Sequence, residues 1–221
     1  AQLIARAAVN TVMSGPASGV MAAAYTGRAC GHANLITYDM GGTSTDVGLI
    51  ENAVPTVSGE LELEYAMPIH VPMVDVRTVG AGGGSIARVN AAGLLEVGPD
   101  SAGSQPGPIC YGRGGTQPTI SDANLVLGRL NPDYFLGGEI GLDVEGARQA
   151  IKEKCADPLG MDVVTVANGI VEIANAAMVN ALRLVSVQRG YDPRHFAMVA
   201  FGGAGPVHAN GDARALFAVD V

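Results

Sequence analysis

Cysteine is scarce in this 221-residue sequence, and its three cysteines, Cys30, Cys110 and Cys155, lie far apart without a CxxC pair. An odd number of widely spaced cysteines argues against a disulfide framework and against a zinc knuckle. No histidine stands at a spacing typical of metal ligands; the four are His32, His70, His195 and His208. We therefore expect reduced, partly buried thiols and structural histidines.

Positive charge is also in short supply, because 13 Lys and Arg residues stand against 21 Asp and Glu residues, giving a formal net charge of −8. Such a balance does not favour a phosphate-backbone surface, so no nucleic acid partner is expected. A single nucleotide is a different case. Backbone N–H groups at glycine turns and helix starts, helped by a divalent cation, neutralise phosphate locally, so the charge leaves ATP open.

Membrane and export signals are missing too. No segment combines a charged start, an apolar centre and a small-residue cleavage site, and no apolar run reads as long enough to cross a bilayer. We expect a cytoplasmic protein with no membrane partner, organised as one domain or two small lobes. Because the sequence opens on a helical pattern and stops on a strand-like apolar run, we also expect it to be part of a longer polypeptide.

Glycine, in contrast, is abundant, and its 31 residues gather in tight clusters between apolar runs. Apolar spacing predicts helices over 3–13 and 16–26, with Ser14 as the cap of the second helix and Pro16 in its first turn. Apolar runs rich in β-formers then predict a hairpin from Asn34 onward, followed by strands at 59–66, 72–79, 85–90 and 94–97.

The second half of the chain has a different pattern. The glycine- and proline-rich stretch 98–119 predicts a long ordered loop or flap. Helical spacing predicts helices at 121–129, 144–156 and 163–189, and Met161 and Met178 read as core residues. A strand at 196–201 then leads into a helix that opens at "GGAGP". The simplest architecture is one α/β unit with a glycine-rich insert.

The segment "YDMGGTSTDVGLI" is the most informative for chemistry. Asp39 ends a strand, Gly41 and Gly42 form a turn, and the return strand begins with three hydroxyl residues, Thr43, Ser44 and Thr45. Adjacent glycines let the backbone approach a ligand, and the following N–H groups and hydroxyls can converge on a phosphate. Asp39 is placed to hold a Mg²⁺-bound water or to orient a nucleophile. An ordinary capped hairpin is the alternative interpretation.

A second glycine turn, "FAMVAFGGAGPVHA", joins a buried strand to a helix. It offers helix N-terminal N–H groups to an anion or an adenosine through Gly202, Gly203 and Gly205. The segment has no complete GxGxxG motif, and a tight strand-to-helix turn explains it equally well when it is taken alone. The two turns together make a nucleotide site the better interpretation.

Two further segments carry weaker candidates. In "GAGGGSIARV", Gly83, Gly84 and Ser85 are a possible backbone-donor nest for substrate, although a glycine-bulged hairpin is the preferred interpretation. In "CYGRGGTQPTISDAN", Arg113, Asp122 and Asn124 are candidates for contact with substrate or a partner subunit, and a helix-capping role is favoured for Asp122.

Taken together, these segments resemble a known family. "DMGGTSTDV" is similar to the second phosphate-binding hairpin of the actin, hexokinase and heat-shock-chaperone ATPase superfamily, and "FGGAGP" to its adenosine loop. With "SGPASGV", "GAGGGSIARV", "VGPDSAGSQPGPICYGRGG" and "PTISDANLVLGRL", they occur in the order typical of the hydantoinase A / 5-oxoprolinase family. The similarity spans essentially the whole sequence.

The resemblance implies an α/β fold: an actin-like, ribonuclease-H-like ATPase lobe with a mixed sheet flanked by helices. Residues 1–221 would form the second lobe, with a β-rich, Gly/Pro-rich insert at about 54–120. The first phosphate hairpin, written like "DVGGTFTD" in the family, does not occur in the sequence. The first lobe of the same chain and a hydantoinase B-type subunit or domain are therefore expected as partners, and the isolated piece is expected to be inactive.

For the site, the resemblance implies that Asp39 and Thr43 are catalytic and that residues 41–45 bind the phosphates of ATP and its Mg²⁺. It also implies that the enzyme phosphorylates the carbonyl oxygen of a small cyclic amide, such as hydantoin, 5-oxoproline or a related lactam, so that water can open the ring. Two alternatives stay open. One is the ATP-binding subunit of an acetone- or acetophenone-type carboxylase, and the other is a non-catalytic actin-like ATP switch.

Overall fold

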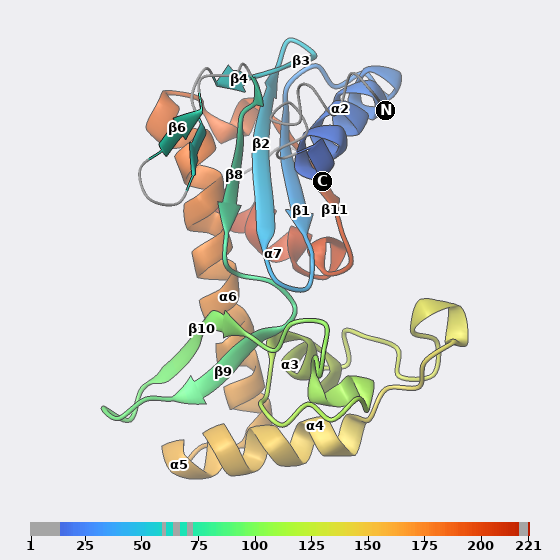
Figure 1. Ribbon diagram of the computed structural model, residues 1–221, viewed down its shortest axis with the longest axis vertical. Helices are drawn as coiled ribbons and strands as arrows, with labels where there is room; N and C mark the ends of the chain where they lie inside the picture. The colour runs from blue at the N-terminus through green and yellow to red at the C-terminus, as the bar shows by residue number, and fades with distance from the viewer. Residues whose placement is uncertain (1–13, 59–60, 64–66, 70–72, 217–220) are drawn as a thin grey trace.

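The computed structural model describes residues 14–58, 61–63, 67–69, 73–216 and 221. The predicted helix at 3–13, parts of the predicted strands at 59–66 and 72–79, and His70 lie outside these residues. The described chain has a sheet unit at one end and a second unit of loops and short helices at the other, and one long helix runs along both (Figure 1).

The sheet unit is built on the predicted hairpin, β1 (Leu35–Met40) and β2 (Thr45–Glu51). The sheet order is β11-β1-β2-β3, and β8 also pairs with β2. Only the pairing of β1 with β11 is parallel, so the sheet is mixed, as predicted. The added strands are β3 (Val54–Pro55), β8 (Val76–Val79) and β11 (Ala197–Phe201).

Helices cover both faces of this sheet, which explains why β1 is buried along nearly its whole length rather than at every second residue. On one face, α2 (Ser14–Cys30) packs Val20 and Ala24 against Leu35. On the other, Ile36, Tyr38 and Met40 share a core with α6 (Val163–Val185) and α7 (Gly205–Leu216). Ser14 and Pro16 both belong to α2, so the prediction that Ser14 caps this helix is wrong.

The second unit, drawn below the sheet in Figure 1, contains the two-stranded sheet of β9 (Ser85–Val89) and β10 (Leu95–Ser101). Its helices are η3 (Ile109–Tyr111), α3 (Ile120–Val126), η4 (Leu136–Gly138) and α4 (Val144–Ile151), which continues into a π-helical turn, η5 (Lys152–Ala156), and α5 (Asp157–Leu159). The remaining short elements are β4 (Val57–Ser58) with β7 (Met73–Val74), β5 (Leu61–Leu63) with β6 (Met67–Ile69), η6 (Val187–Arg189) and η7 (Pro193–His195).

One boundary differs from its prediction for an identifiable reason. The loop expected from residue 98 starts later, because β10 continues through Gly98 and Pro99 to Ser101. The pairing register shifts between Val97 and Ser101, and Gly98 adopts a φ of +70°. A two-stranded sheet tolerates proline at such an irregularity, because few ladder hydrogen bonds depend on it.

Helix α6 connects the two units. Together with η6 it forms an apolar stretch, Val163–Arg189, that has the length and composition of a membrane span, so the prediction that no run is long enough is wrong. Half of its most apolar 18-residue window is buried inside the protein, and the core helix of a soluble protein passes the same test of length and composition. Met178 is fully buried in it, whereas Met161, just before it, is 54% exposed and is not the core residue predicted.

Candidate functional site

The turn between β1 and β2 presents free backbone donors. The Gly41 N–H donates to the carbonyl of Ser44 at 2.9 Å and closes the turn. Among the described residues, the N–H groups of Gly42, Thr43 and Ser44 have no hydrogen-bond partner. Gly42 and Thr43 are exposed, and the turn lies at the end of the sheet that faces the second unit (Figure 1). Such a run of unpaired N–H groups is suited to an anion.

The glycine cluster at 82–84 supports this turn from behind. The Gly83 N–H donates to the Gly41 carbonyl at 3.0 Å, and the Gly84 N–H donates to the Gly42 carbonyl at 2.6 Å. A Cβ at Gly82 would lie 2.7 Å from the backbone of Gly42 and Thr43, so only glycine allows this approach. The N–H groups of Gly83 and Gly84, considered from the sequence as donors for substrate, are therefore bonded within the protein, and both residues line the cavity described below.

Two hydroxyls that were candidates for ligand binding hold the same turns together. Thr45 is fully buried, and its Oγ1 donates to the Ala81 carbonyl at 2.6 Å. Ser85 is 1% exposed, and its Oγ accepts the Gly82 N–H at 3.0 Å. In this structure both side chains stabilise the backbone and do not line the cavity described below.

The loop after β11 is fixed to the end of β1. Gly202 has a φ of +82°, and a Cβ there would lie 2.4 Å from Oδ1 of Asp39 and from the carbonyl of Met40. The next anchor is the Ala204 N–H, which donates to the Met40 carbonyl at 2.9 Å. Helix α7 starts directly afterwards at Gly205. The two glycine turns predicted to bind phosphate and adenosine therefore lie side by side.

Asp39 lies at the edge of this arrangement. Its carboxylate is adjacent to Gly202 and to Gly19 of α2, and it does not line the cavity. Burial, followed by the charge of its cross-strand neighbour Asp46, raises the pKa of Asp39 above its ordinary value. A bound cation nearby would favour the charged form. Among the described residues, no group of three or more His, Cys, Asp or Glu side chains is placed to hold a metal ion.

A cavity of about 380 Å³ opens between the sheet unit and the second unit. Its volume falls in the usual range of small-molecule sites. The β1–β2 turn, the glycine cluster at 82–84 and the loop at 202–205 line one part of it, through Gly41, Gly42, Thr43, Gly83, Gly84, Gly203 and Ala204. The remaining wall carries side chains from the flap, α3, the segment that follows it and α7, namely Ser104, Pro108, Tyr111, Arg113, Ser121, Asn124, Leu130, Phe135 and Val207, with Gly103 among them.

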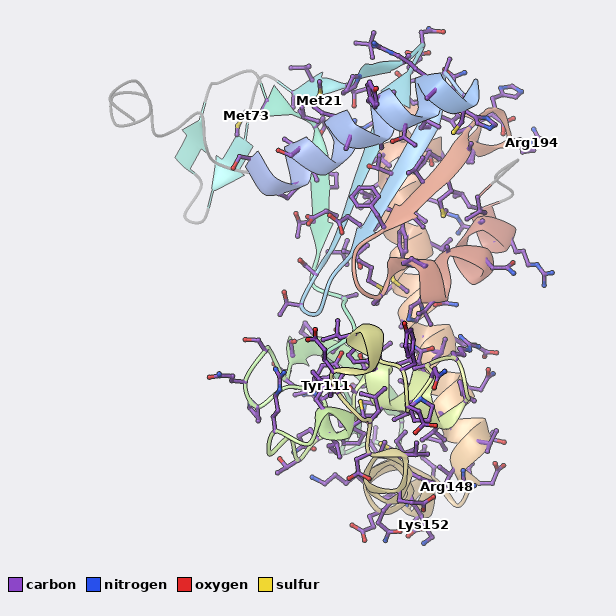
Figure 2. All side chains as sticks on the ribbon, turned by 90° about the vertical axis from the view of Figure 1, so that its right-hand side faces the viewer. Met21, Met73, Tyr111, Arg148, Lys152 and Arg194 are labelled. Atoms are coloured by element: carbon purple, nitrogen blue, oxygen red, sulfur yellow. The ribbon has the colours of Figure 1, made fainter. Side chains whose placement is uncertain are left out.

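The flap is held over the cavity by Asp122. This carboxylate accepts the N–H of Cys110 at 2.8 Å and the N–H of Thr119 at 2.8 Å, and it completes a capping box with Thr119 at the start of α3. The favoured helix-capping role is confirmed. Tyr111 stacks on Phe135 with ring centroids 5.4 Å apart, and Figure 2 places Tyr111 just below the sheet unit. The aromatic wall was not recognised from the sequence, because flap residues follow no periodic pattern.

A buried polar chain lies behind the cavity where α3, α6 and α7 meet. Nδ1 of His208 is 2.6 Å from Oδ1 of Asn175, and Nε2 of His208 is 3.0 Å from Nδ2 of Asn124. Burial lowers the pKa of His208 to about 4, which keeps the ring neutral near pH 7. The prediction of a structural histidine fits this position. Cys110 and Cys155 are likewise buried free thiols, whereas Cys30 is exposed.

Comparison with known proteins decides the family. The sequence pattern described as Hydantoinase/oxoprolinase matches residues 1–218. The chain belongs to this family. It is 48% identical over 202 residues to the caprolactamase subunit alpha of Pseudomonas jessenii, covering 91% of this chain and 29% of that subunit. The expected resemblance is confirmed, and the family member described here spans less than a third of that relative.

Two solved structures confirm the fold of this family member. The nucleotide-free structure of acetone carboxylase, from work on ATP-dependent acetone carboxylation, matches with a TM-score of 0.85 at 39% identity, over 94% of this chain and 29% of that one. The ATP-dependent caprolactamase from Pseudomonas jessenii matches with a TM-score of 0.84 at 45% identity, over 93% and 30%. The predicted actin-like α/β lobe with a mixed sheet is therefore correct.

Proposed function

We propose that this chain is the second lobe of an ATP-dependent enzyme that opens a cyclic amide such as a hydantoin, 5-oxoproline or a related lactam. The observation that carries the proposal is the β1–β2 turn. There the N–H groups of Gly42, Thr43 and Ser44 have no partner within the described part of the chain, and Gly42 and Thr43 line a cavity. These donors suit phosphate oxygens. The names of the family and of its caprolactamase relatives support the amide substrate.

The residues of this chain fit Mg·ATP in four ways. The turn at 42–44, exposed at Gly42 and Thr43, would bind the phosphates, and Gly203 with Ala204 would border the adenosine. Asp39 would hold Mg²⁺ through water, since this ion usually keeps several waters and takes only one or two protein carboxylates. Arg113, exposed on the flap and lining the cavity, adds a positive charge on the same side.

ATP, when bound, would supply the phosphoryl group for the carbonyl oxygen of the amide. Its transfer breaks a P–O bond of ATP and forms one to the substrate. Water then adds to the carbonyl carbon, and cleavage of the C–N bond opens the ring and leaves an acyl phosphate. A second water releases the phosphate and leaves a carboxylate. The tasks of this lobe are to position and to stabilise charge, which dominate phosphoryl transfer. Thr43 is the proposed catalytic hydroxyl, because it is exposed at the turn and lines the cavity.

The rest of the site would come from other polypeptide. We propose that the other phosphate-binding lobe faces the β1–β2 turn, that a hydantoinase B-type subunit or domain completes the substrate site, and that the enzyme works in the cytoplasm. This chain covers less than a third of the length of its caprolactamase relatives, which are more than three times as long. That difference in length supports a site shared with other parts of the protein.

A ketone carboxylase is the second candidate, favoured by the match to acetone carboxylase. Both reactions need phosphate-binding donors at this turn, so the geometry of this lobe is compatible with either. Dependence on bicarbonate distinguishes the carboxylase from the hydrolase. ATP consumption that depends on a ketone and bicarbonate, with no opening of lactams, would replace the hydrolase proposal by the carboxylase.

The test is calorimetric titration of Mg·ATP into this chain and into the full-length protein, each with and without Asp39→Ala, followed by assays of ring opening with hydantoin, 5-oxoproline and caprolactam. We expect tight binding only by the full-length protein, a loss of binding in Asp39→Ala, and ATP-dependent opening of at least one ring. Asp133→Ala, which removes an exposed carboxylate of the second unit, is the matched control. Absence of nucleotide binding to the full-length protein would refute the proposal.

A further inference from the structure

The cavity has walls of two kinds, and this division suggests how a nucleotide would lie in it. The glycine turns offer backbone donors, whereas Tyr111, Leu130, Phe135 and Val207 offer flat or branched apolar surfaces. A nucleotide has the matching division between charged phosphates and a flat base. Val207 belongs to the first turn of α7, directly after the loop proposed to border the adenosine, so the base is expected beside Val207 and α3.

Asn124 of α3 lines this part of the cavity and is 3% exposed. Its Nδ2 is directed to Nε2 of His208, but its Oδ1 is buried and has no hydrogen-bond partner among the described residues. A buried acceptor without a partner is costly, and native proteins rarely leave one unless a water or ligand completes it. The unpaired oxygen therefore indicates a donor that the described residues do not provide.

With both amides oriented as in the structure, the polar chain behind Asn124 leaves the oxygen of its amide free. Oδ1 of Asn175 only accepts, so Nδ1 of His208 must carry the proton. In a neutral ring Nε2 is then an acceptor, and it requires the Nδ2 donor of Asn124. Oδ1 of Asn124 is left free. The reverse pattern, with both amides flipped and the proton on Nε2, would instead leave a donor free.

We propose that Asn124 is a specificity-determining residue that accepts a hydrogen bond from the 6-amino group of adenine, and that His208 and Asn175 are positioning residues that fix its amide. The inference rests on the proposed ATP function. The low pKa of His208 agrees with it, because a protonated ring would present two donors and break the pattern. A base with a 6-oxo group would place an acceptor against the free oxygen and be rejected.

The test compares the affinities of ATP and ITP for the full-length protein, because ITP carries the 6-oxo group. We expect ATP to bind at least about tenfold more tightly, since the site is left with an unpaired acceptor when ITP binds. Asn124→Leu and Asn175→Leu should bring the two affinities together. Asn180→Leu, at an exposed position of α6, is the matched control.

A second measurement does not depend on any variant. Histidine-labelled protein should show the His208 ring protonated on Nδ1 by 15N NMR, and protonation on Nε2 would overturn the inference. Equal affinities for ATP and ITP in the unmodified protein would overturn it while leaving the proposed function intact. An Asn124→Leu variant that raises the KM for the cyclic amide without changing the ATP/ITP ratio would assign the donor to the substrate instead. No binding of either nucleotide would overturn both.

Discussion

Two glycine turns of similar composition have opposite roles in this protein. In the turn at 41–44, the three N–H groups that follow Gly41 have no partner among the described residues, whereas in the turn at 82–85 every N–H is bonded within the protein. The second turn is buried and packs its backbone directly on the first. Glycine thus supplies access to a ligand in one turn and close backbone packing in the other, and the difference lies in where the N–H groups are directed.

The strongest test of this comparison is Gly82→Ala, which places a Cβ 2.7 Å from the backbone of Gly42 and Thr43. The turn at 41–44 has to move, so we expect a loss of about 1–3 kcal/mol in the free energy of unfolding. Nucleotide affinity should fall about tenfold to a hundredfold, or about 1.4–2.8 kcal/mol.

The matched control is Gly80→Ala, because Gly80 is exposed and has no atom within 4 Å of an added Cβ. Chemical denaturation and calorimetry on both variants measure the two effects. Equal behaviour of Gly82→Ala and Gly80→Ala would show that the second turn does not support the first.

The next test compares two threonines of one turn, one exposed and one buried. Thr43→Ala removes an exposed hydroxyl and should weaken nucleotide binding by about tenfold with little change in stability, because a hydrogen bond to a charged group is worth about 1.5–3 kcal/mol. Thr45→Val removes the buried donor of the Ala81 carbonyl and should cost about 1–3 kcal/mol of stability. Its effect on affinity should be the smaller one. The opposite assignment of the two effects would contradict the geometry of the turn.

Ser85→Ala should lower both stability and nucleotide affinity, but by less than Gly82→Ala does. It removes the acceptor of the Gly82 N–H and should lower the free energy of unfolding by about 1 kcal/mol. Nucleotide affinity should fall by less than in Gly82→Ala, because the backbone bonds from Gly83 and Gly84 to the first turn remain. Ser104→Ala, at an exposed position of the flap, is the control for stability, and thermal unfolding of both variants is the measurement.

The sequence was sufficient to predict the elements that depend on local pattern. The hairpin, the long helix and the strand before α7 all follow from apolar spacing and glycine turns. The sequence was insufficient where residues that bond or stack with one another are distant along the chain. A donor nest at 83 and 84 stayed open as an alternative because the acceptors of these N–H groups lie some 40 residues away, and Asn124 meets His208 across 84 residues. Tyr111 and Phe135 were missed for a similar reason, since loops bring them together.

The smallest expected effect concerns Asp39 at the entry to the first turn. Because burial and Asp46 raise its pKa, the folded state binds its proton more tightly than the unfolded state does. Its contribution to stability is therefore largest below the ordinary value of 3.8 and is lost as the pH rises through the raised pKa.

Without nucleotide, Asp39→Asn should melt slightly above the unmodified protein at pH 7 and match it near pH 3, while Asp133→Asn shows no such difference. Saturating Mg·ATP should reverse the order, because only the unmodified protein gains the stabilisation of the bound ligand. A reversal that fails to occur, with the ligand still binding to both, would remove Asp39 from the proposed site and leave the phosphate site to the backbone of the first turn alone.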